Sequence, residues 1–158
     1  MSTVSTTTAT TDANRQRIQN IMAELDKGNG KPFVEAMADD FSWTIPGGTP
    51  WSRTYRGKQQ VLTELLRPLY AQFATPYIST TRRVMADGDM VIIEFDGRVT
   101  TKAGKAYNNH YCYVCRMADG QMKDLMEYLD TALVSSALEA PSSPAPLSPA
   151  HAPEPQVL

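Results

Sequence analysis

The chain has 158 residues, the length of one domain, and 42% of them are apolar while 20% are charged. Its formal net charge of −2 argues against a general nucleic-acid or anionic-membrane binder, because such proteins need a basic surface. No run of apolar residues is long enough to span a membrane, and the Ser/Thr-rich start lacks the features of a secretory signal. With only two cysteines, no disulfide scaffold is expected, and a cytoplasmic location is predicted.

The two ends differ in composition from the middle of the chain. Residues 1–11 are mostly Ser, Thr and Ala, and residues 139–158 contain six prolines. Neither stretch has the apolar area to offset the entropy lost on ordering it. The sequence therefore predicts one domain over residues 12–138 between two disordered tails.

Helical patterns occupy the first part of this domain. Asp12 is placed to cap a helix whose apolar stripe runs from Ile18 to Leu25, and Pro32 opens a short second helix. A third helix is predicted over residues 58–73, where Pro68 should kink it or end it early.

Strand patterns follow. A short strand at residues 41–45 precedes a Gly- and Pro-rich loop, and four longer strands are expected near residues 77–86, 90–101, 105–117 and 122–132. The dipeptides Asp87-Gly88, Ala103-Gly104 and Asp119-Gly120 predict hairpin turns between them. Helices followed by an antiparallel meander define an α+β fold, in which a bent sheet against helices encloses a pocket.

Turn lengths set the pairing of these strands. A two-residue loop at Ala103-Gly104 and a three-residue loop at 118–120 would place Asp96, Tyr111 and Glu127 in one row across three strands. The same register puts Glu94 opposite Tyr113 and Arg98 opposite Asn109. If either loop differs by one residue, the strand pairing shifts and these three residues no longer lie in one row.

Two interpretations of the second long strand remain open. Its apolar residues alternate with Glu94, Asp96 and Arg98. In the first interpretation the apolar face packs on the helices and the polar residues face water. In the second, the polar residues line the pocket and the apolar face forms a dimer interface. The apolar residues are Val91, Ile93, Phe95, Gly97 and Val99.

Three segments carry a family resemblance: ADDFSWTIPGG at 38–48, YRGKQQV at 55–61, and residues 91–133, which contain G-x-x-Y-N-N-x-Y-C followed by D-G and E-Y-x-D. This order resembles the SnoaL-like branch of the ketosteroid isomerase and nuclear transport factor two superfamily. The resemblance implies a cone-shaped fold whose polar strand face lines the pocket, and a homodimer through the convex sheet face.

The resemblance also bears on individual residues. Asp96 and Glu127 stand where the related epoxide hydrolases carry catalytic carboxylates, but Glu94 replaces an arginine of those enzymes. Ile45 lies near the position of the base aspartate of ketosteroid isomerases. In SnoaL-type cyclases an acid near Glu127 serves as acid and base, and that match is kept.

The candidate residues predict cofactor-free acid/base chemistry of isomerase, cyclase or hydratase type on a small apolar carbonyl compound. Asp96 and Glu127 are the candidate proton carriers, and Tyr111 is the candidate donor to a developing enolate oxygen. Candidate ligand contacts are Trp43, Trp51, Glu94, Asn109 and Tyr113.

Two further expectations concern metals and function. The pair Cys112 and Cys115 is not a metal site, because residues three apart on a strand face opposite sides. The alternative function is a module of the same fold that binds a hydrophobic ligand, or a second chain, without turnover.

Overall fold

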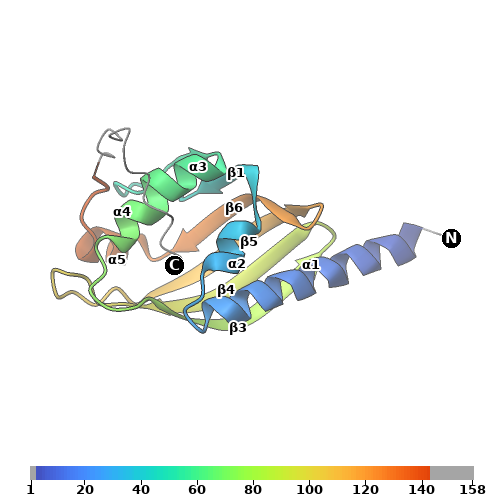
Figure 1. Cartoon of the computed structure of the whole chain (residues 1–158), viewed down its shortest axis with the longest axis horizontal. Coiled ribbons are helices and arrows are strands. Elements are labelled where there is room, and N and C mark those ends of the chain that lie inside the picture. Colours follow the sequence, from blue (N-terminus) through green and yellow to red (C-terminus); the bar gives the residue numbers. More distant parts are fainter. Residues whose placement is uncertain (1–2, 143–158) are drawn as a thin grey trace, which may run out of the picture.

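The computed structural model of the chain describes residues 3–142 and consists of a bent six-stranded sheet with helices on its inner side (Figure 1). The helical elements are α1 (Thr3–Leu25), α2 (Lys31–Glu35), α3 (Lys58–Gln60), the π-helical η1 (Val61–Leu66), α4 (Arg67–Tyr70) and α5 (Thr131–Ala137). The strands are β1 (Met37–Thr44), β2 (Thr54–Arg56), β3 (Ile78–Asp87), β4 (Met90–Arg98), β5 (Asn109–Ala118) and β6 (Gln121–Leu129). The predicted α+β class is confirmed, while most of the predicted Pro-rich tail, residues 143–158, lies outside the described residues.

The sheet is mixed, not purely antiparallel as predicted. Its strand order is β2-β1-β6-β5-β4-β3, and β3 to β6 form the expected antiparallel meander. β1, however, pairs with β6 in parallel. A parallel pair needs a long crossover connection, and here everything from β2 to β5 provides it. The pairing brings the Trp43 region of β1 beside the middle of β6.

Helix α1 begins well before the predicted cap. The structure is helical from Thr3, and Asp12 forms an ion pair at 2.8 Å with Arg15 inside the helix instead of capping its start. The predicted stripe is confirmed, since Ile18, Ile21 and Met22 are buried. No helix within residues 3–142 is both long and apolar enough to cross a membrane.

The predicted third helix is one helical segment in three parts. Pro68 lacks the N–H that would bond to the carbonyl four residues earlier, and the six residues from Val61 to Leu66 adopt π-helical geometry just before it. The segment then continues to Tyr70, so Pro68 changes its hydrogen bonding without ending it.

A fifth α-helical element, α5, takes the place of the predicted end of the last strand. The Asp130 side chain accepts hydrogen bonds from the N–H groups of Ala132 and Leu133, at 2.9 and 3.1 Å. An aspartate in this position is a strong helix N-cap, and it ends β6 at Leu129.

The loop between β4 and β5 is one residue longer than predicted. Thr100 pairs with Ala106, and the Thr101 N–H donates to the Lys105 carbonyl at 2.8 Å, so the loop comprises residues 102–104. Gly104 has a φ of +77°, the left-handed conformation typical of the last residue of a three-residue hairpin loop. The predicted two-residue loop is wrong, and the pairing of β4 with β5 moves by one residue.

The loop between β5 and β6 is one residue shorter than predicted. Asp119 and Gly120, with φ values of 52° and 73°, form a two-residue turn that pairs Ala118 with Gln121. A bulge after Arg116 shifts the pairing by one more residue. The shorter loop and the bulge together shift the pairing of β6 with β5 by two residues. A shift of two residues leaves the same side chains on the inner face, and Glu127 lies opposite Tyr113.

The first interpretation of β4 is therefore correct. Val91, Ile93 and Phe95 are buried against the helices, while Glu94 and Asp96 lie on the outer face of the sheet. The second interpretation, with the polar residues in the pocket, is wrong.

Candidate functional site

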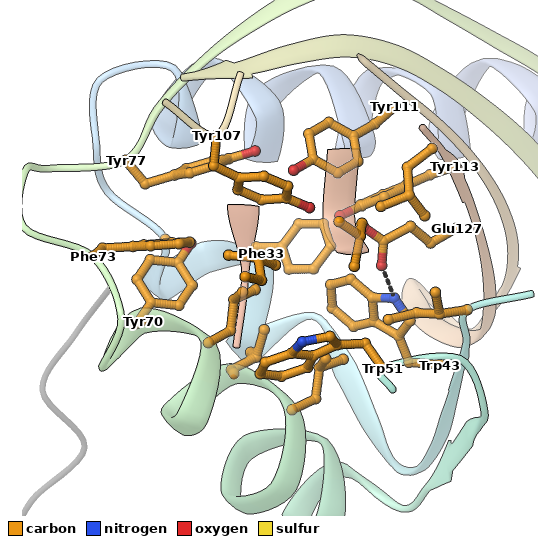
Figure 2. Close-up of a pocket in the computed structure, with 18 of the residues that line it drawn as sticks. Phe33, Trp43, Trp51, Tyr70, Phe73, Tyr77, Tyr107, Tyr111, Tyr113 and Glu127 are labelled. Atoms are coloured by element: carbon orange, nitrogen blue, oxygen red, sulfur yellow. Dashed lines mark hydrogen bonds between the residues drawn. The ribbon is translucent and has the colours of Figure 1, made fainter. Parts of the chain in front are cut away.

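The inner face of the sheet and the helices enclose one aromatic cavity, called the aromatic pocket below (Figure 2). Its volume is about 70 Å³. The walls come from β1, β4, β5 and β6, from α2, from the helical segment η1–α4, and from α5. The aromatic side chains that line it are Phe33, Trp43, Trp51, Tyr70, Phe73, Tyr77, Phe95, Tyr107, Tyr111 and Tyr113.

Glu127 carries the one carboxyl group among the residues that line this pocket. Its side chain is buried, and Trp43 donates its indole N–H to the carboxyl Oε2 at 2.6 Å. Burial raises the pKa of Glu127 to about 7, although hydrogen bonds from Trp43 and Tyr113 lower it in part. A carboxyl group with this pKa exchanges protons near neutral pH.

Three neighbouring strands position this acid. Tyr113 on β5 lies directly opposite Glu127, and Trp43 on β1 pairs with Leu125, two residues earlier on the same face of β6. The Trp43 and Tyr113 rings meet edge to face, with centroids 5.5 Å apart. The carboxyl group is therefore held between two aromatic side chains of rigid elements.

Phenol groups occupy another part of the pocket (Figure 2). Burial raises the pKa of Tyr77 and Tyr111 well above the ordinary value and that of Tyr107 to about 12, so all three stay protonated at neutral pH. The Tyr111 hydroxyl, which faces those of Tyr77 and Tyr107 (Figure 2), offsets part of the rise in their pKa values. We call these three side chains the phenol cluster.

Asn109 supports the phenol cluster from behind. Its Oδ1 accepts the backbone N–H groups of His110 and Asp130, at 2.8 and 3.0 Å, and this fixes the orientation of the amide. Its Nδ2 therefore donates to the Tyr107 hydroxyl, at 3.3 Å, and to the Asp130 carbonyl. Asn109 is buried but does not line the pocket, in contrast to its predicted place as a ligand contact.

The predicted row of Asp96, Tyr111 and Glu127 does not form. With the longer loop, Asp96 pairs with His110 and Phe95 pairs with Tyr111, so Asp96 points to the outer face. There the carboxylate contacts Arg82 and His110, both of which lower its pKa.

Glu94 is displaced for the same reason, because the one-residue shift applies along the whole strand. It lies opposite Cys112 and forms an ion pair with Arg83 at 2.5 Å on the outer face. The predicted ligand contact with Glu94 is therefore absent from the aromatic pocket.

Five of the predicted site residues do line the pocket: Trp43, Trp51, Tyr111, Tyr113 and Glu127. Trp51 is fixed by its indole N–H, which donates to the Glu139 carbonyl at 2.9 Å.

Sequence reasoning missed Tyr77 and Tyr107 as pocket residues. Tyr107 lies in the Y-N-N-x-Y segment, and its even, four-residue spacing from Tyr111 was a usable signal that both side chains share one face. No local signal marks Tyr77. A Cβ on Gly97 would lie 2.1 Å from the Tyr77 hydroxyl, so only glycine at that position of β4 leaves room for this phenol.

Within residues 3–142, no group of three His, Cys, Asp or Glu side chains is placed to hold a metal ion. Cys112 lies on the outer face and Cys115 is buried, as expected for residues three apart on a strand.

The comparisons with known proteins agree with this architecture. A family model described as the SnoaL-like domain matches residues 18–125, more than half of the chain. The chain therefore belongs to the SnoaL-like family. Glu127 lies two residues beyond the matched segment. None of the curated proteins matches the chain.

Solved structures show the same fold at low identity. An NTF2-like protein of unknown function from Burkholderia pseudomallei has a TM-score of 0.68 at 20% identity, covering 79% of this chain and 96% of that one. A SnoaL-like polyketide cyclase from Jannaschia has a TM-score of 0.67 at 16% identity, covering 84% and 96%. An LEH-like epoxide hydrolase from M. tuberculosis has a TM-score of 0.61 at 20% identity, covering 81% and 90%. At these identities the similarity establishes the cone-shaped NTF2-like fold.

Proposed function

We propose that the chain is an acid/base catalyst in which Glu127 moves a proton on a small, neutral carbonyl compound bound in the aromatic pocket. The observation that carries this proposal is a carboxyl group buried among aromatic rings and held by Trp43 at 2.6 Å, with a pKa raised to about 7. Carboxyl groups whose pKa is raised toward neutrality by burial cluster at sites of proton transfer.

The proposed step needs no other reactant. The Glu127 carboxylate takes a proton from the carbon next to the carbonyl, the C–H electron pair forms a C=C bond, and the carbonyl oxygen becomes an enolate oxygen. Glu127 then returns the proton to another carbon, which gives isomerisation. If the proton on the carboxyl group first exchanges with water, Glu127 returns a solvent proton to the original carbon, which gives exchange. Atoms and electrons balance in this step without a cofactor.

The lining supports a neutral, apolar ligand. No Lys, Arg or His side chain is among the residues that line the pocket within the described part of the chain. A phosphate or carboxylate would therefore be buried without a countercharge and next to an acid, which is unfavourable. Flat apolar molecules, by contrast, fit between aromatic rings.

A second candidate function is ligand binding without turnover. It is favoured by the outward position of Asp96, which leaves the pocket with one carboxyl group in place of the predicted pair. One carboxyl group suffices to carry a proton between two carbon atoms. Reactions that need one carboxyl group as base and a second as acid would lack the second group.

The experiment measures exchange of the methyl protons of acetophenone in D₂O by NMR. We expect wild type to catalyse exchange and Glu127→Gln to lower the rate by about 100-fold or more. Asp96→Asn is the matched control, because it removes a carboxylate on the outer face and should leave the rate unchanged.

Two results would contradict catalysis by Glu127. One is exchange that survives in Glu127→Gln, and the other is equal loss in Asp96→Asn. Binding of acetophenone without any exchange in wild type would support the second candidate function.

A further inference from the structure

The aromatic pocket is smaller than a ring-sized ligand. Its volume is about 70 Å³, whereas an apolar cavity that takes up one benzene ring has about 150 Å³. Acetophenone is a benzene ring with an acetyl group, so it does not fit into the pocket as the structure has it. Protein interiors are closely packed, and part of the wall must therefore move before such a ligand enters.

One part of the wall belongs to no strand or helix: residues 138–142, which follow α5 and which we call the lid segment. Its first residue, Leu138, lines the pocket and is only half-buried, so its side chain lies between the cavity and the solvent. Most of the remaining wall comes from one sheet and from helices, whose backbone groups bond to one another. Moving those elements breaks many hydrogen bonds, whereas moving the lid segment breaks few.

In the described part of the chain, three hydrogen bonds hold the lid segment to elements other than α5, and all of them are at Glu139. The Glu139 carbonyl accepts from the Gln72 side-chain amide at 3.0 Å and from the Trp51 indole at 2.9 Å. The Glu139 N–H donates to the Gln72 Oε1 at 2.9 Å. The Gln72 backbone is itself fixed, because its N–H donates to the Leu69 carbonyl at 3.1 Å and its carbonyl accepts the Lys102 N–H at 2.7 Å. Gln72 therefore holds Glu139 from a fixed position.

From this arrangement we infer that the lid segment opens to admit the ligand, and that Gln72 sets how often it opens. In the open state Leu138 leaves the pocket, and its space becomes available to a ring. The inference rests on the proposed function for the class of ligand and adds the size that is accepted: the closed state takes only small apolar molecules, and ring compounds bind the open state. Gln72 is then a specificity-determining residue that does not line the pocket.

The test compares two apolar probes: xenon, a single atom that small apolar cavities bind, and acetophenone. NMR titration of backbone amide signals measures both affinities. A ligand that binds only a minor state gains affinity in proportion to the population of that state. Gln72→Ala removes two of the three hydrogen bonds, so the affinity for acetophenone should rise by about fivefold or more while that for xenon changes less than about twofold.

A second variant acts on the lid segment itself. Glu139→Pro removes only the N–H that donates to Gln72, so it should raise the affinity for acetophenone by a smaller factor than Gln72→Ala does. Leu138 has an extended backbone, with φ −107° and ψ 141°, which is compatible with a proline at the next position.

Amide hydrogen exchange at Glu139 gives a second readout. Because bound acetophenone keeps the lid segment open, saturating acetophenone should speed this exchange in wild type, and xenon should not. Gln60→Ala is the matched control: Gln60 also accepts a backbone N–H, from Arg56 at 2.6 Å, and donates to Glu64 at 3.3 Å, but it has no hydrogen bond to the lid segment in the described structure. It should change the affinity for acetophenone less than about twofold.

The inference is overturned if Gln72→Ala leaves the ratio of acetophenone to xenon affinity unchanged, if Gln60→Ala raises this ratio as much, or if acetophenone slows exchange at Glu139 in wild type. It is also overturned if acetophenone binds to neither wild type nor Gln72→Ala.

Titrations in Glu127→Gln separate this inference from the proposed function, because opening of the lid segment involves no proton transfer. A gain in acetophenone affinity on adding Gln72→Ala to Glu127→Gln, with no catalysed exchange of acetophenone protons in wild type, would leave the lid segment and remove the catalyst. Catalysed exchange that is lost in Glu127→Gln, with equal affinities in wild type and Gln72→Ala, would leave the catalyst and remove the lid segment.

Discussion

The Glu127 carboxyl group binds its proton more tightly in the folded chain than in the unfolded one, since burial raises its pKa from 4.5 to about 7. A raised pKa means that this group favours folding below pH 4.5 and that the contribution is lost as the pH rises through about 7. The acid that we propose for catalysis therefore lowers the stability of the protein at neutral pH.

This linkage predicts a pH-dependent difference between wild type and Glu127→Gln. Between pH 5 and 8 the free energy of unfolding of wild type should fall by about 2 to 3 kcal/mol more than that of the variant, because glutamine does not titrate. Urea unfolding at the two pH values measures the difference. Parallel pH profiles would show that Glu127 has an ordinary pKa.

Trp43 should control the pKa of Glu127 through its indole N–H. Trp43→Phe removes the hydrogen bond that lowers this pKa, so the pKa should rise further, and the core should lose about 1 to 3 kcal/mol of stability. A pH titration of the carboxyl carbon by NMR measures the shift. Trp51→Phe is the matched control, because the Trp51 indole donates to the Glu139 backbone carbonyl and not to Glu127. A similar rise in the pKa of Glu127 in Trp51→Phe would contradict the role given to Trp43.

At the residue scale, sequence reasoning found Glu127 and the aromatic residues around it but misplaced Asp96. Trp43 lies between Ser42 and Thr44, and Tyr111 and Tyr113 lie two residues apart on β5, so a period of two was enough to assign these side chains to the inner face. Asp96 belongs to an equally regular strand, whose polar face lies outside. Composition alone does not tell whether a pocket is lined by the polar or the apolar face of a strand.

At the scale of elements, the longer helices and strands were predictable, whereas several of their ends and the turn lengths were not. Asp-Gly and Ala-Gly each mark a turn, but glycine can end a three-residue loop, as Gly104 does, or close a two-residue turn, as Gly120 does. One residue of difference reverses the two faces of a strand. The bulge after Arg116 had no sequence signal, yet it restored the inner face of β6.

Helix α5 and the residues after it form one wall of the pocket, and Gln72 holds this segment in place. Its side chain donates to the Glu139 carbonyl at 3.0 Å and accepts the Glu139 N–H at 2.9 Å, while Val134 and Leu138 line the pocket.

Removing the two hydrogen bonds between Gln72 and Glu139 should make the segment after α5 open more often. In Gln72→Ala we expect faster amide hydrogen exchange at Leu138 and Glu139, with the rest of the sheet unchanged, because both hydrogen bonds are lost. Gln16→Ala is the control, since the Gln16 side chain is exposed on α1 and donates a hydrogen bond to Asn20. Unchanged exchange at Glu139 would mean that Gln72 does not hold the wall.

At the scale of the whole molecule, the order of helices and strands follows from hydrophobic periodicity, whereas the parallel pairing of β1 with β6 depends on contacts far apart in the sequence. Among residues 3–142, no helix covers the outer face of the sheet (Figure 1). It carries half-buried Ile92, Val114 and Met126 beside Tyr128, which is 50% exposed.

We expect this outer face to bind a second copy of the chain, which would make the homodimer predicted from the family resemblance. Light scattering after size exclusion should give about twice the monomer mass for wild type and the monomer mass for Val114→Lys, because a charge in an apolar interface is unfavourable. Gln59→Lys, which adds the same charge at an exposed position of α3, should stay dimeric. A monomeric wild type would refute the dimer.

The account as a whole depends on the ionisation of one carboxyl group, and an NMR titration of the Glu127 carboxyl carbon tests it most directly. The spectrum of Glu127→Gln assigns the signal by its absence. We predict a midpoint near pH 7, as expected for an acid buried among aromatic rings. A midpoint near 4.5, the ordinary value for glutamate, would show that the carboxyl group is solvated and that the pocket holds no proton carrier.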